Sequence, residues 1–189
     1  MALIAPIPGQ IRELGRKFGI MLIEQDFTLP TGETSTWALW SVHSSKGSAS
    51  IVMPITTEGK ILALRQYRYG AKDFMLELPG GMPSPGESAA DAAKKELLEE
   101  TGYEVGRMVS LGVKPFICAP RCDYRLELLL AMQCRKVAEP KLEAEEIAEH
   151  VEMAIEEWYR RVWAGEVLDG QMISLSMLAL PHLANIKFK

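Results

Sequence analysis

The chain has 189 residues, enough for one domain with a small appendage or for two small domains. Apolar residues make up 48% and charged residues 24%, which are ordinary globular values and exclude a disordered or collagen-like chain. The 21 Lys and Arg are outnumbered by 25 Asp and Glu, giving a formal net charge of −4. An acidic chain has no overall attraction for nucleic acid, so we expect no nucleic-acid partner.

The cysteines and the N-terminal residues bear on the compartment. Cys118, Cys122 and Cys134 are an odd number and indicate no disulfide framework, which is typical of a reducing compartment. The first 20 residues lack the unbroken apolar stretch of a signal peptide. No apolar run approaches the roughly 20 residues that a membrane span needs. We therefore expect a soluble, cytoplasmic protein that does not act at a membrane.

The N-terminal part of the chain predicts two strands. Residues 20–29 and 34–43 are strand-like and flank a Pro-Thr-Gly turn. Residues 44–48, SSKGS, form a polar connector, and the pattern changes after it. We therefore predict an N-terminal β subdomain over residues 1–46 and a main domain over residues 47–189.

The main domain combines strands with helices. Strand-like runs occur at residues 50–55, 61–67, 74–78, 108–118 and 124–133. Helices are expected at 87–101, 155–164 and 169–180, with Gly102 and Gly165 as stops, Asp169 as a cap and Pro181 as the final end. Three large apolar residues, Met153, Trp158 and Trp163, are assigned to the core. This order predicts an α/β (α+β) fold with helices packed on a mixed sheet.

The helix at 87–101 carries three carboxylates on one side. A helix turns about 100° per residue, so Glu96, Glu99 and Glu100 fall within an arc of about 100°. Like charges this close repel, whereas Mg²⁺ takes oxygen ligands from a few carboxylates together with substrate phosphates. The alternative is an ordinary solvated face beside Lys94 and Lys95. The loop before the helix favours the metal, because Gly80 and Gly81 let their backbone approach a ligand closely.

The loop and helix together have a defined spacing. It consists of Gly81, five residues, Glu87, seven residues, Lys95-Glu96-Leu97, one residue, Glu99-Glu100, one residue and Gly102-Tyr103. This spacing resembles the Nudix box, G-x5-E-x7-R-E-U-x-E-E-x-G-U with U apolar, except that Lys95 replaces Arg. Similarity to the Nudix hydrolase family extends over roughly residues 43–189, including RQYR at 65–68 and ELPGG at 77–81.

The resemblance implies a Nudix α/β/α sandwich around a mixed sheet and hydrolysis of nucleoside diphosphates linked to another moiety. It implies that Glu96, Glu99 and Glu100 hold Mg²⁺, or Mn²⁺ by the same oxygen chemistry, with the carbonyl of Gly80 as a further ligand. Glu87 and Gly102 would have structural roles in the motif.

The sequence outside the box resembles the branch that hydrolyses ADP-ribose and nucleoside-diphosphate sugars. The N-terminal strands resemble the subdomain through which that branch forms homodimers. The catalytic base in this branch often comes from an acidic loop, here LEAEEIAEH at 142–150. Glu146 is favoured as the base, followed by Glu145. Glu99 and Glu100 remain alternatives, as does a simple solvated loop.

Five side chains and one glycine are candidates for binding the substrate. Arg68 suits a phosphate or the terminal sugar, because arginine pairs bidentately with phosphate, and Arg65 could be an ordinary surface charge. Glu77 could bind the sugar or only its own loop. Trp37 and Trp40 could stack on a base or pack in a dimer core. The backbone of Gly81 is the last candidate, because no side chain keeps a ligand away from it.

Lys95 leaves a second function open. Arginine would form two hydrogen bonds in a fixed geometry, whereas lysine offers a point charge on a flexible stem. We expect a less rigid enzyme, and the alternative is a Nudix-fold protein that senses ADP-ribose or a nucleotide without hydrolysing it. An RNA-decapping enzyme fits poorly, because the chain is acidic and has no basic stripe interleaved with aromatic residues.

Overall fold

The computed structural model describes residues 3–17, 20–42, 48–143 and 145–183. The chain divides into two compact units, Met1–Lys46 with Phe116–Arg125 and Gly47–Pro115 with Leu126–Lys189. The connector expected at 44–48 lies outside the described residues except for Ser48. In the described part of the chain, no helix has both the length and the apolar character needed to cross a membrane.

The first unit contains an antiparallel sheet of β1 (Ile7–Lys17), β2 (Ile20–Thr28) and β3 (Thr34–Val42), in that order. The sequence predicted β2 and β3 but not β1. Two register shifts, near Pro8 and near Gly15, interrupt the strand pattern of β1. Its side chains are almost all exposed, which removes the usual alternation of polar and apolar residues. The strands expected at 20–29 and 34–43 are therefore confirmed as β2 and β3, and the structure adds β1 to them.

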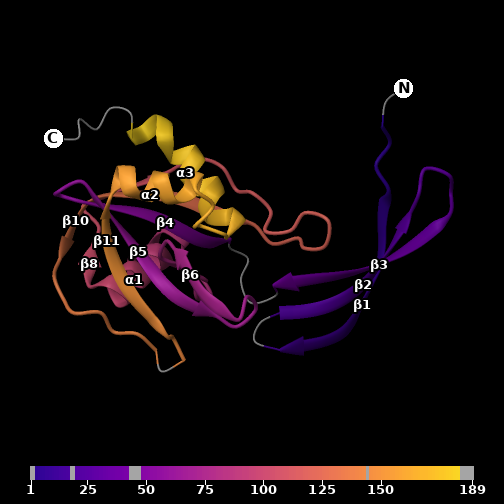
Figure 1. The fold of residues 1–189 in the computed structure, drawn as a ribbon. Helices are drawn as coiled ribbons and strands as arrows, with labels where there is room; N and C mark the ends of the chain where they lie inside the picture. The colour runs from indigo at the N-terminus through magenta and orange to yellow at the C-terminus, as the bar shows by residue number, and fades with distance from the viewer. Residues whose placement is uncertain (1–2, 18–19, 43–47, 144, 184–189) are drawn as a thin grey trace. The chain divides into compact units, whose positions relative to one another are not determined.

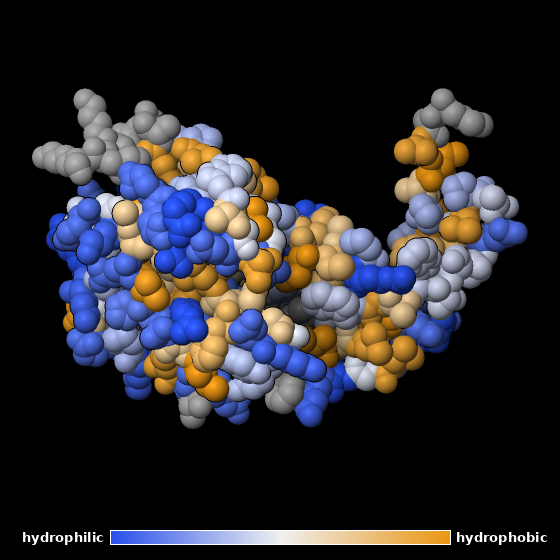
Figure 2. All heavy atoms as spheres, in the orientation of Figure 1, coloured by the Kyte–Doolittle hydropathy of each residue, from blue (hydrophilic) through white to orange (hydrophobic). Residues whose placement is uncertain are grey.

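Residues 116–125 belong to this first unit. Cys118 and Cys122 form a turn in which the Cys122 amide donates to the Cys118 carbonyl at 2.8 Å. The turn is attached to β3, because the Trp40 amide donates to the Arg121 carbonyl at 2.9 Å. The Arg121 guanidinium lies over the Trp37 ring, 4.7 Å from its centroid. Figure 2 shows apolar side chains gathered on the surface of this unit, and its exposed apolar residues include Ile7, Ile11, Leu14, Ile20 and Leu22.

The second unit is built on a mixed sheet. Its strands are β4 (Ala49–Thr56), β5 (Lys60–Arg68), β6 (Asp73–Glu77), β7 (Gly80–Gly81), β8 (Tyr103–Glu104), β9 (Arg107–Ser110), β10 (Leu126–Lys136) and β11 (Ala148–Ala154). The order is β11-β5-β4-β10-β8, and β6, β7 and β9 pair with β5, β4 and β10 respectively. The pairing of β4 with β10 is parallel and the others are antiparallel.

Helices cover both faces of this sheet. Every residue of β4 is buried, as expected for a central strand with layers on both sides. Helix α1 (Ala89–Thr101) lies on one face, and α2 (Ile155–Trp163) and α3 (Gly170–Leu183) lie on the other (Figure 1). The helices packed on a mixed sheet that the sequence pattern predicted, and the α/β/α sandwich that the resemblance implied, are both confirmed.

Helix α1 has well-defined ends. Ser88 caps its start, because the Ser88 hydroxyl accepts a hydrogen bond from the Asp91 amide at 3.1 Å. Gly102 ends it in the left-handed conformation, with φ of 79°. A β-carbon at Gly102 would overlap the Ala138 carbonyl, so both the backbone angle and the packing require glycine. Glu87, expected at the helix start, lies just before the cap.

Three other expectations differ from the structure. The predicted strand at 108–118 is only β9, because the chain leaves the sheet after Ser110. Helix α3 continues past Pro181 to Leu183, since a proline in the last turn removes only one hydrogen bond. Trp163 is 69% exposed at the end of α2 and is not part of the core, whereas Trp158 is fully buried.

Candidate functional site

The acidic side chains of α1 have three different surroundings. Glu99 is partly exposed and lies 3.5 Å from the ammonium of Lys95, one helical turn away. Glu96 is half-buried. Glu100 is only 5% exposed, because it lies on the helix face that packs against the sheet with Ala93 and Leu97. The helix therefore directs one carboxylate to solvent and two toward the sheet side.

The glycines before the helix lie directly against this acidic side. Gly80 and Gly81 form β7, which pairs with Ile51 and Ser50 of β4. A β-carbon on Gly81 would overlap the carboxylate of Glu96, and one on Gly80 would overlap the Ser50 carbonyl. A side chain at position 80 would therefore force the backbone to shift, whereas one at position 81 would displace the Glu96 carboxylate.

The loop between β7 and α1 is fastened by Glu87. The Glu87 carboxylate accepts a hydrogen bond from the Ser84 amide at 2.8 Å, and the Glu87 amide donates to the Ser84 carbonyl at 3.0 Å. These two bonds close the loop on itself just before the helix cap. Glu87 thus contacts its own loop, and it is not among the residues that line the acidic cavity described below.

Burial and repulsion by nearby carboxylates disfavour the charged forms of Glu96 and Glu100. Burial, followed by the charges of Glu96 and Glu146, raises the pKa of Glu100 to about 8. A backbone hydrogen bond from Gly80 and the charge of Arg68 act in the opposite direction. The pKa of Glu96 is also raised, chiefly by burial. A nearby cation would reverse this penalty, because positive charge favours the ionised carboxylate.

The donor atoms fit a hard divalent cation. One oxygen of Glu100, Oε2, is buried and has no hydrogen-bond partner among the described residues. Leaving such an atom without a partner costs about 1–3 kcal/mol, so the site favours a ligand there. Carboxylate oxygens suit Mg²⁺ or Mn²⁺. Within the described residues, however, no three His, Cys, Asp or Glu side chains are already arranged to hold one ion.

A cavity of about 400 Å³ adjoins Glu96 and Glu99. It is lined by Lys95, Glu96, Glu99, Lys141, Leu142, Glu143 and Glu146. The structure thus brings Glu146 from the acidic loop to the carboxylates of α1. The Glu146 carboxylate accepts a hydrogen bond from the Glu143 amide at 2.9 Å, which fixes its direction. Glu145 is exposed and does not line this cavity.

Arg68 and Glu77 bind each other. The Arg68 Nε donates to the Glu77 carboxylate at 2.8 Å, and Glu77 is only 3% exposed. Arg68 is half-exposed and also acts electrostatically on Glu100. The pair therefore places a cation beside the inner carboxylates, with part of its guanidinium open to solvent.

The remaining substrate-binding candidates are one arginine of β5 and the two tryptophans of the first unit. Arg65 is exposed on β5, 3.4 Å from Glu149 and over the ring of Phe74. Because alternate side chains of a strand face opposite sides, Arg65 points away from the face that Arg68 occupies. Trp37 and Trp40 lie on β3 of the first unit.

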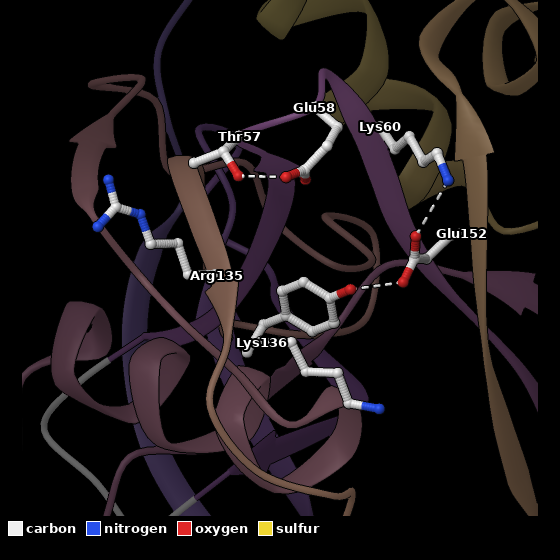
Figure 3. Close-up of a pocket in the computed structure, with 7 residues that line it drawn as sticks. Thr57, Glu58, Lys60, Arg135, Lys136 and Glu152 are labelled. Atoms are coloured by element: carbon white, nitrogen blue, oxygen red, sulfur yellow. Dashed lines mark hydrogen bonds and ion pairs between the residues drawn. The ribbon is translucent and has the colours of Figure 1, made fainter.

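A second cavity of the main unit, of about 420 Å³, differs in character (Figure 3). Its acidic side chains already have partners. The Glu58 carboxylate accepts from the Thr57 hydroxyl at 2.7 Å. Glu152 accepts from the Tyr103 hydroxyl and lies 3.4 Å from the Lys60 ammonium. Satisfied carboxylates offer no reason for a cation, so the acidic cavity beside α1 is the candidate site.

Sequence reasoning missed one contact of this site and one buried polar residue of β5. The Lys141 amide donates to the Glu99 carbonyl at 2.7 Å, which fastens the acidic loop to the end of α1. Gln66 is buried on β5, and its amide oxygen has no partner among the described residues. Gln66 could have been found from the RQYR segment, because it lies two residues before Arg68 and therefore on the same side of the strand.

Comparisons with known proteins agree with the geometry. The family model described as NUDIX domain matches residues 45–171. The chain is 29% identical over 154 residues to a Bacillus subtilis protein named ADP-ribose pyrophosphatase, covering 80% of each chain. It is 27% identical over 158 residues to the methanol dehydrogenase activator of Bacillus methanolicus, covering 82% of this chain and 81% of that one.

A solved structure described as an ADP compounds hydrolase has the same fold. The two chains superpose with a TM-score of 0.83, at 18% identity, and the match covers 100% of both. At this sequence identity the structural similarity is evidence for the fold alone. The family model, in contrast, matches a range of residues that includes the acidic motif of α1.

Proposed function

Because the chain belongs to the NUDIX domain family, we propose that it hydrolyses the pyrophosphate bond of ADP-ribose or a related nucleoside-diphosphate sugar with Mg²⁺. The products would be a nucleoside monophosphate and a sugar phosphate. The similarity to the protein named ADP-ribose pyrophosphatase, which spans most of both chains, supports this substrate class. The free thiols of all three cysteines suit a reducing, cytoplasmic setting.

The observation that carries the proposal is the buried carboxylate pair of α1. Burial raises the pKa of both Glu96 and Glu100, the charge of Glu96 raises the pKa of Glu100 further, and Glu100 has an oxygen without a partner among the described residues. A structural role alone would favour neutral or apolar residues here, because buried charge is unfavourable unless it is compensated. A bound cation would compensate the charges of these two carboxylates and so account for their burial.

The residues of the site would have three roles, which are metal binding, proton transfer and phosphate binding. Glu96 and Glu100, with Glu99 and the Gly80 carbonyl, would hold Mg²⁺ or Mn²⁺. When bound, the cation neutralises the pyrophosphate and makes a nearby water more acidic. Glu146 would take the proton of the attacking water, since it lines the same cavity as Glu96. Arg68 would direct its free donors to a substrate phosphate while it holds Glu77.

The test is turnover of a small panel with and without Mg²⁺. The panel contains ADP-ribose, ADP-glucose, UDP-glucose, GDP-mannose, NADH, a diadenosine polyphosphate and an oxidised deoxynucleoside triphosphate. Metal-dependent release of a nucleoside monophosphate from a diphosphate sugar is the expected result. Preference for the triphosphate would assign the chain to another substrate class.

A sensor that binds without hydrolysis is the second candidate, and Lys95 favours it. Lys95 is exposed and makes one 3.5 Å ion pair with Glu99, in place of the two fixed hydrogen bonds an arginine can make. Calorimetric binding of ADP-ribose with no turnover of any panel member would support the sensor.

We also propose that the chain is a homodimer formed through the first unit. Its three-stranded sheet has exposed apolar side chains on β1 and β2, among them Ile11 and Leu22. A second copy that covers these side chains would remove their apolar surface from water, which favours association. Sedimentation of the full chain should give twice the monomer mass, and Leu22→Asp should lower it. A monomeric wild-type chain at micromolar concentration would contradict the proposal.

A further inference from the structure

Gln66 is a buried residue on β5 whose amide oxygen is unsatisfied. Its side chain is 6% exposed, and Oε1 has no hydrogen-bond partner among the described residues. Alternation along β5 places Gln66 on the same side as Leu62, which packs against Ala93 and Leu97 of α1. An unsatisfied amide on the helix-facing side of the sheet is unfavourable for folding, so a ligand of the site is its natural partner.

Gln66 has neighbours along the chain and across the sheet that connect it to the candidate site. Gln66 pairs with Ala148 at the start of β11, two residues after Glu146. The Tyr67 amide donates to the Ile147 carbonyl at 2.9 Å, which fastens the loop carrying Glu146 to β5. On the other side, Arg68 shares the face of Gln66 and acts on Glu100. Gln66 therefore lies on β5 between the point where the loop of Glu146 is fastened to the strand and Arg68, the residue that acts on Glu100.

We propose that Gln66 is a further catalytic residue, whose Oε1 accepts a hydrogen bond from the water that attacks the pyrophosphate. This inference rests on the proposed hydrolysis. The water would donate one hydrogen to Gln66 and the other to Glu146. A bond forms between the water oxygen and one phosphorus, the bridging P–O bond breaks, and its electron pair leaves with the departing phosphate. The proton given up by the water goes to Glu146.

A neutral acceptor suits this position. Glu96, Glu100 and Glu146 already repel one another, so a further carboxylate would add to the repulsion before any cation is bound. An amide oxygen directs the water without competing for its proton. Fixing the attacking atom in the direction of reaction lowers the barrier through orientation alone.

The test compares Gln66→Met with Gln66→Glu in the full chain. Methionine has a similar length but no strong acceptor, whereas glutamate keeps the acceptor at the same place. Tyr124→Phe is the matched control, because the Tyr124 hydroxyl is also buried without a partner among the described residues but belongs to the first unit. For each variant we would measure kcat and KM with Mg²⁺, and the melting temperature without metal.

Gln66→Met should lower kcat by about a hundredfold, the scale on which misplacing a reacting group slows a reaction, with KM changed less than about threefold. Gln66→Glu should keep kcat within about tenfold of wild type when Mg²⁺ is present. The metal-free melting temperature of Gln66→Met should be unchanged or higher, as for Tyr124→Phe, because an unsatisfied polar atom is removed.

The proposal is overturned if Gln66→Met keeps wild-type kcat, or if its activity falls only in proportion to the folded fraction. Loss of activity in both Gln66→Met and Gln66→Glu would also contradict the proposal, because Gln66→Glu keeps a hydrogen-bond acceptor at this position. Failure of the wild-type chain to hydrolyse any substrate would instead contradict the proposed function, so the two failures are distinguishable.

Discussion

Gly81 and Glu96 are packed so closely that a β-carbon at position 81 would overlap the Glu96 carboxylate. The contact joins the glycine of β7 to the acidic side of α1, two segments that the motif separates by 14 residues. It explains why a small residue ends the strand before the helix, and it leads to a prediction about activity.

Gly81→Ala should lower kcat at least tenfold, because the methyl group displaces the Glu96 carboxylate from its position beside Glu100. The stability change should be small, under about 1 kcal/mol, since only the end of a flexible side chain has to move. Gly70→Ala is the matched control, because nothing lies within 4 Å of its added β-carbon. Steady-state kinetics and thermal unfolding of both variants test this, and equal kcat for Gly81→Ala and wild type would contradict it.

Removing Glu100 should change how stability depends on pH in the metal-free protein. The pKa of Glu100 is raised to about 8 from an ordinary value of 4.5, so the folded state holds this proton more tightly than the unfolded state. The stabilising contribution is therefore complete below about pH 4.5 and is lost as pH rises toward 8, by a total of a few kcal/mol. Glu100→Gln should remove this loss.

Chemical denaturation with a chelator between pH 5 and 9 measures the effect of Glu100. Adding Mg²⁺ at pH 8 should stabilise the wild-type chain and have little effect on Glu100→Gln, because in the proposed site the cation would bind the folded state through this carboxylate. The groups that act on Glu100 are Glu96, Glu146, Arg68 and the Gly80 backbone. An unchanged pH dependence in Glu100→Gln would refute the assignment.

The pair of Arg68 and Glu77 should show strong coupling in stability. Arg68→Met leaves the Glu77 carboxylate, which is 3% exposed, without its cation. The expected loss is about 2 kcal/mol, reduced from the value for a fully buried pair because Arg68 is half-exposed. Glu77→Gln in the Arg68→Met background should restore part of it. A double-mutant cycle by urea unfolding measures this coupling, and purely additive losses would contradict it.

Lys95→Arg distinguishes a less rigid enzyme from a sensor. An arginine at this position can make two hydrogen bonds with a carboxylate of α1, so kcat should rise severalfold while KM changes little. Lys95→Met should change the free energy of unfolding by less than about 0.5 kcal/mol, because the 3.5 Å pair with Glu99 is exposed. No turnover in either the wild type or Lys95→Arg would favour the sensor.

Much of the main unit could be predicted from its sequence because local signals agreed with the packing. The strand-like runs correspond to β4, β5 and β6, and the Ala- and Glu-rich segment corresponds to α1 with Gly102 at its end. Asp169 caps α3, since its carboxylate accepts from the Gln171 amide at 2.7 Å. Each of these features is set by neighbours within a few residues along the chain.

The features that could not be predicted depend on distant contacts. Strand β1 is stabilised by pairing with β2 and by the Arg12 guanidinium, which binds both carboxylate oxygens of Asp26 at 2.8 Å. The placement of residues 116–125 with the first unit depends on hydrogen bonds to β3. Likewise, the different surroundings of Glu96, Glu99 and Glu100 follow from packing against the sheet, which helical spacing alone does not contain.

The most direct test of the account is hydrolysis of ADP-ribose by the wild-type chain and by Glu96→Gln, with Mg²⁺ and with a chelator, alongside calorimetric binding. The account predicts that the wild type releases a nucleoside monophosphate and a sugar phosphate only with Mg²⁺. Glu96→Gln should lose at least a hundredfold in kcat while it still binds ADP-ribose. Turnover that survives both the chelator and Glu96→Gln would contradict the central claim that the carboxylates of α1 form the hydrolytic metal site.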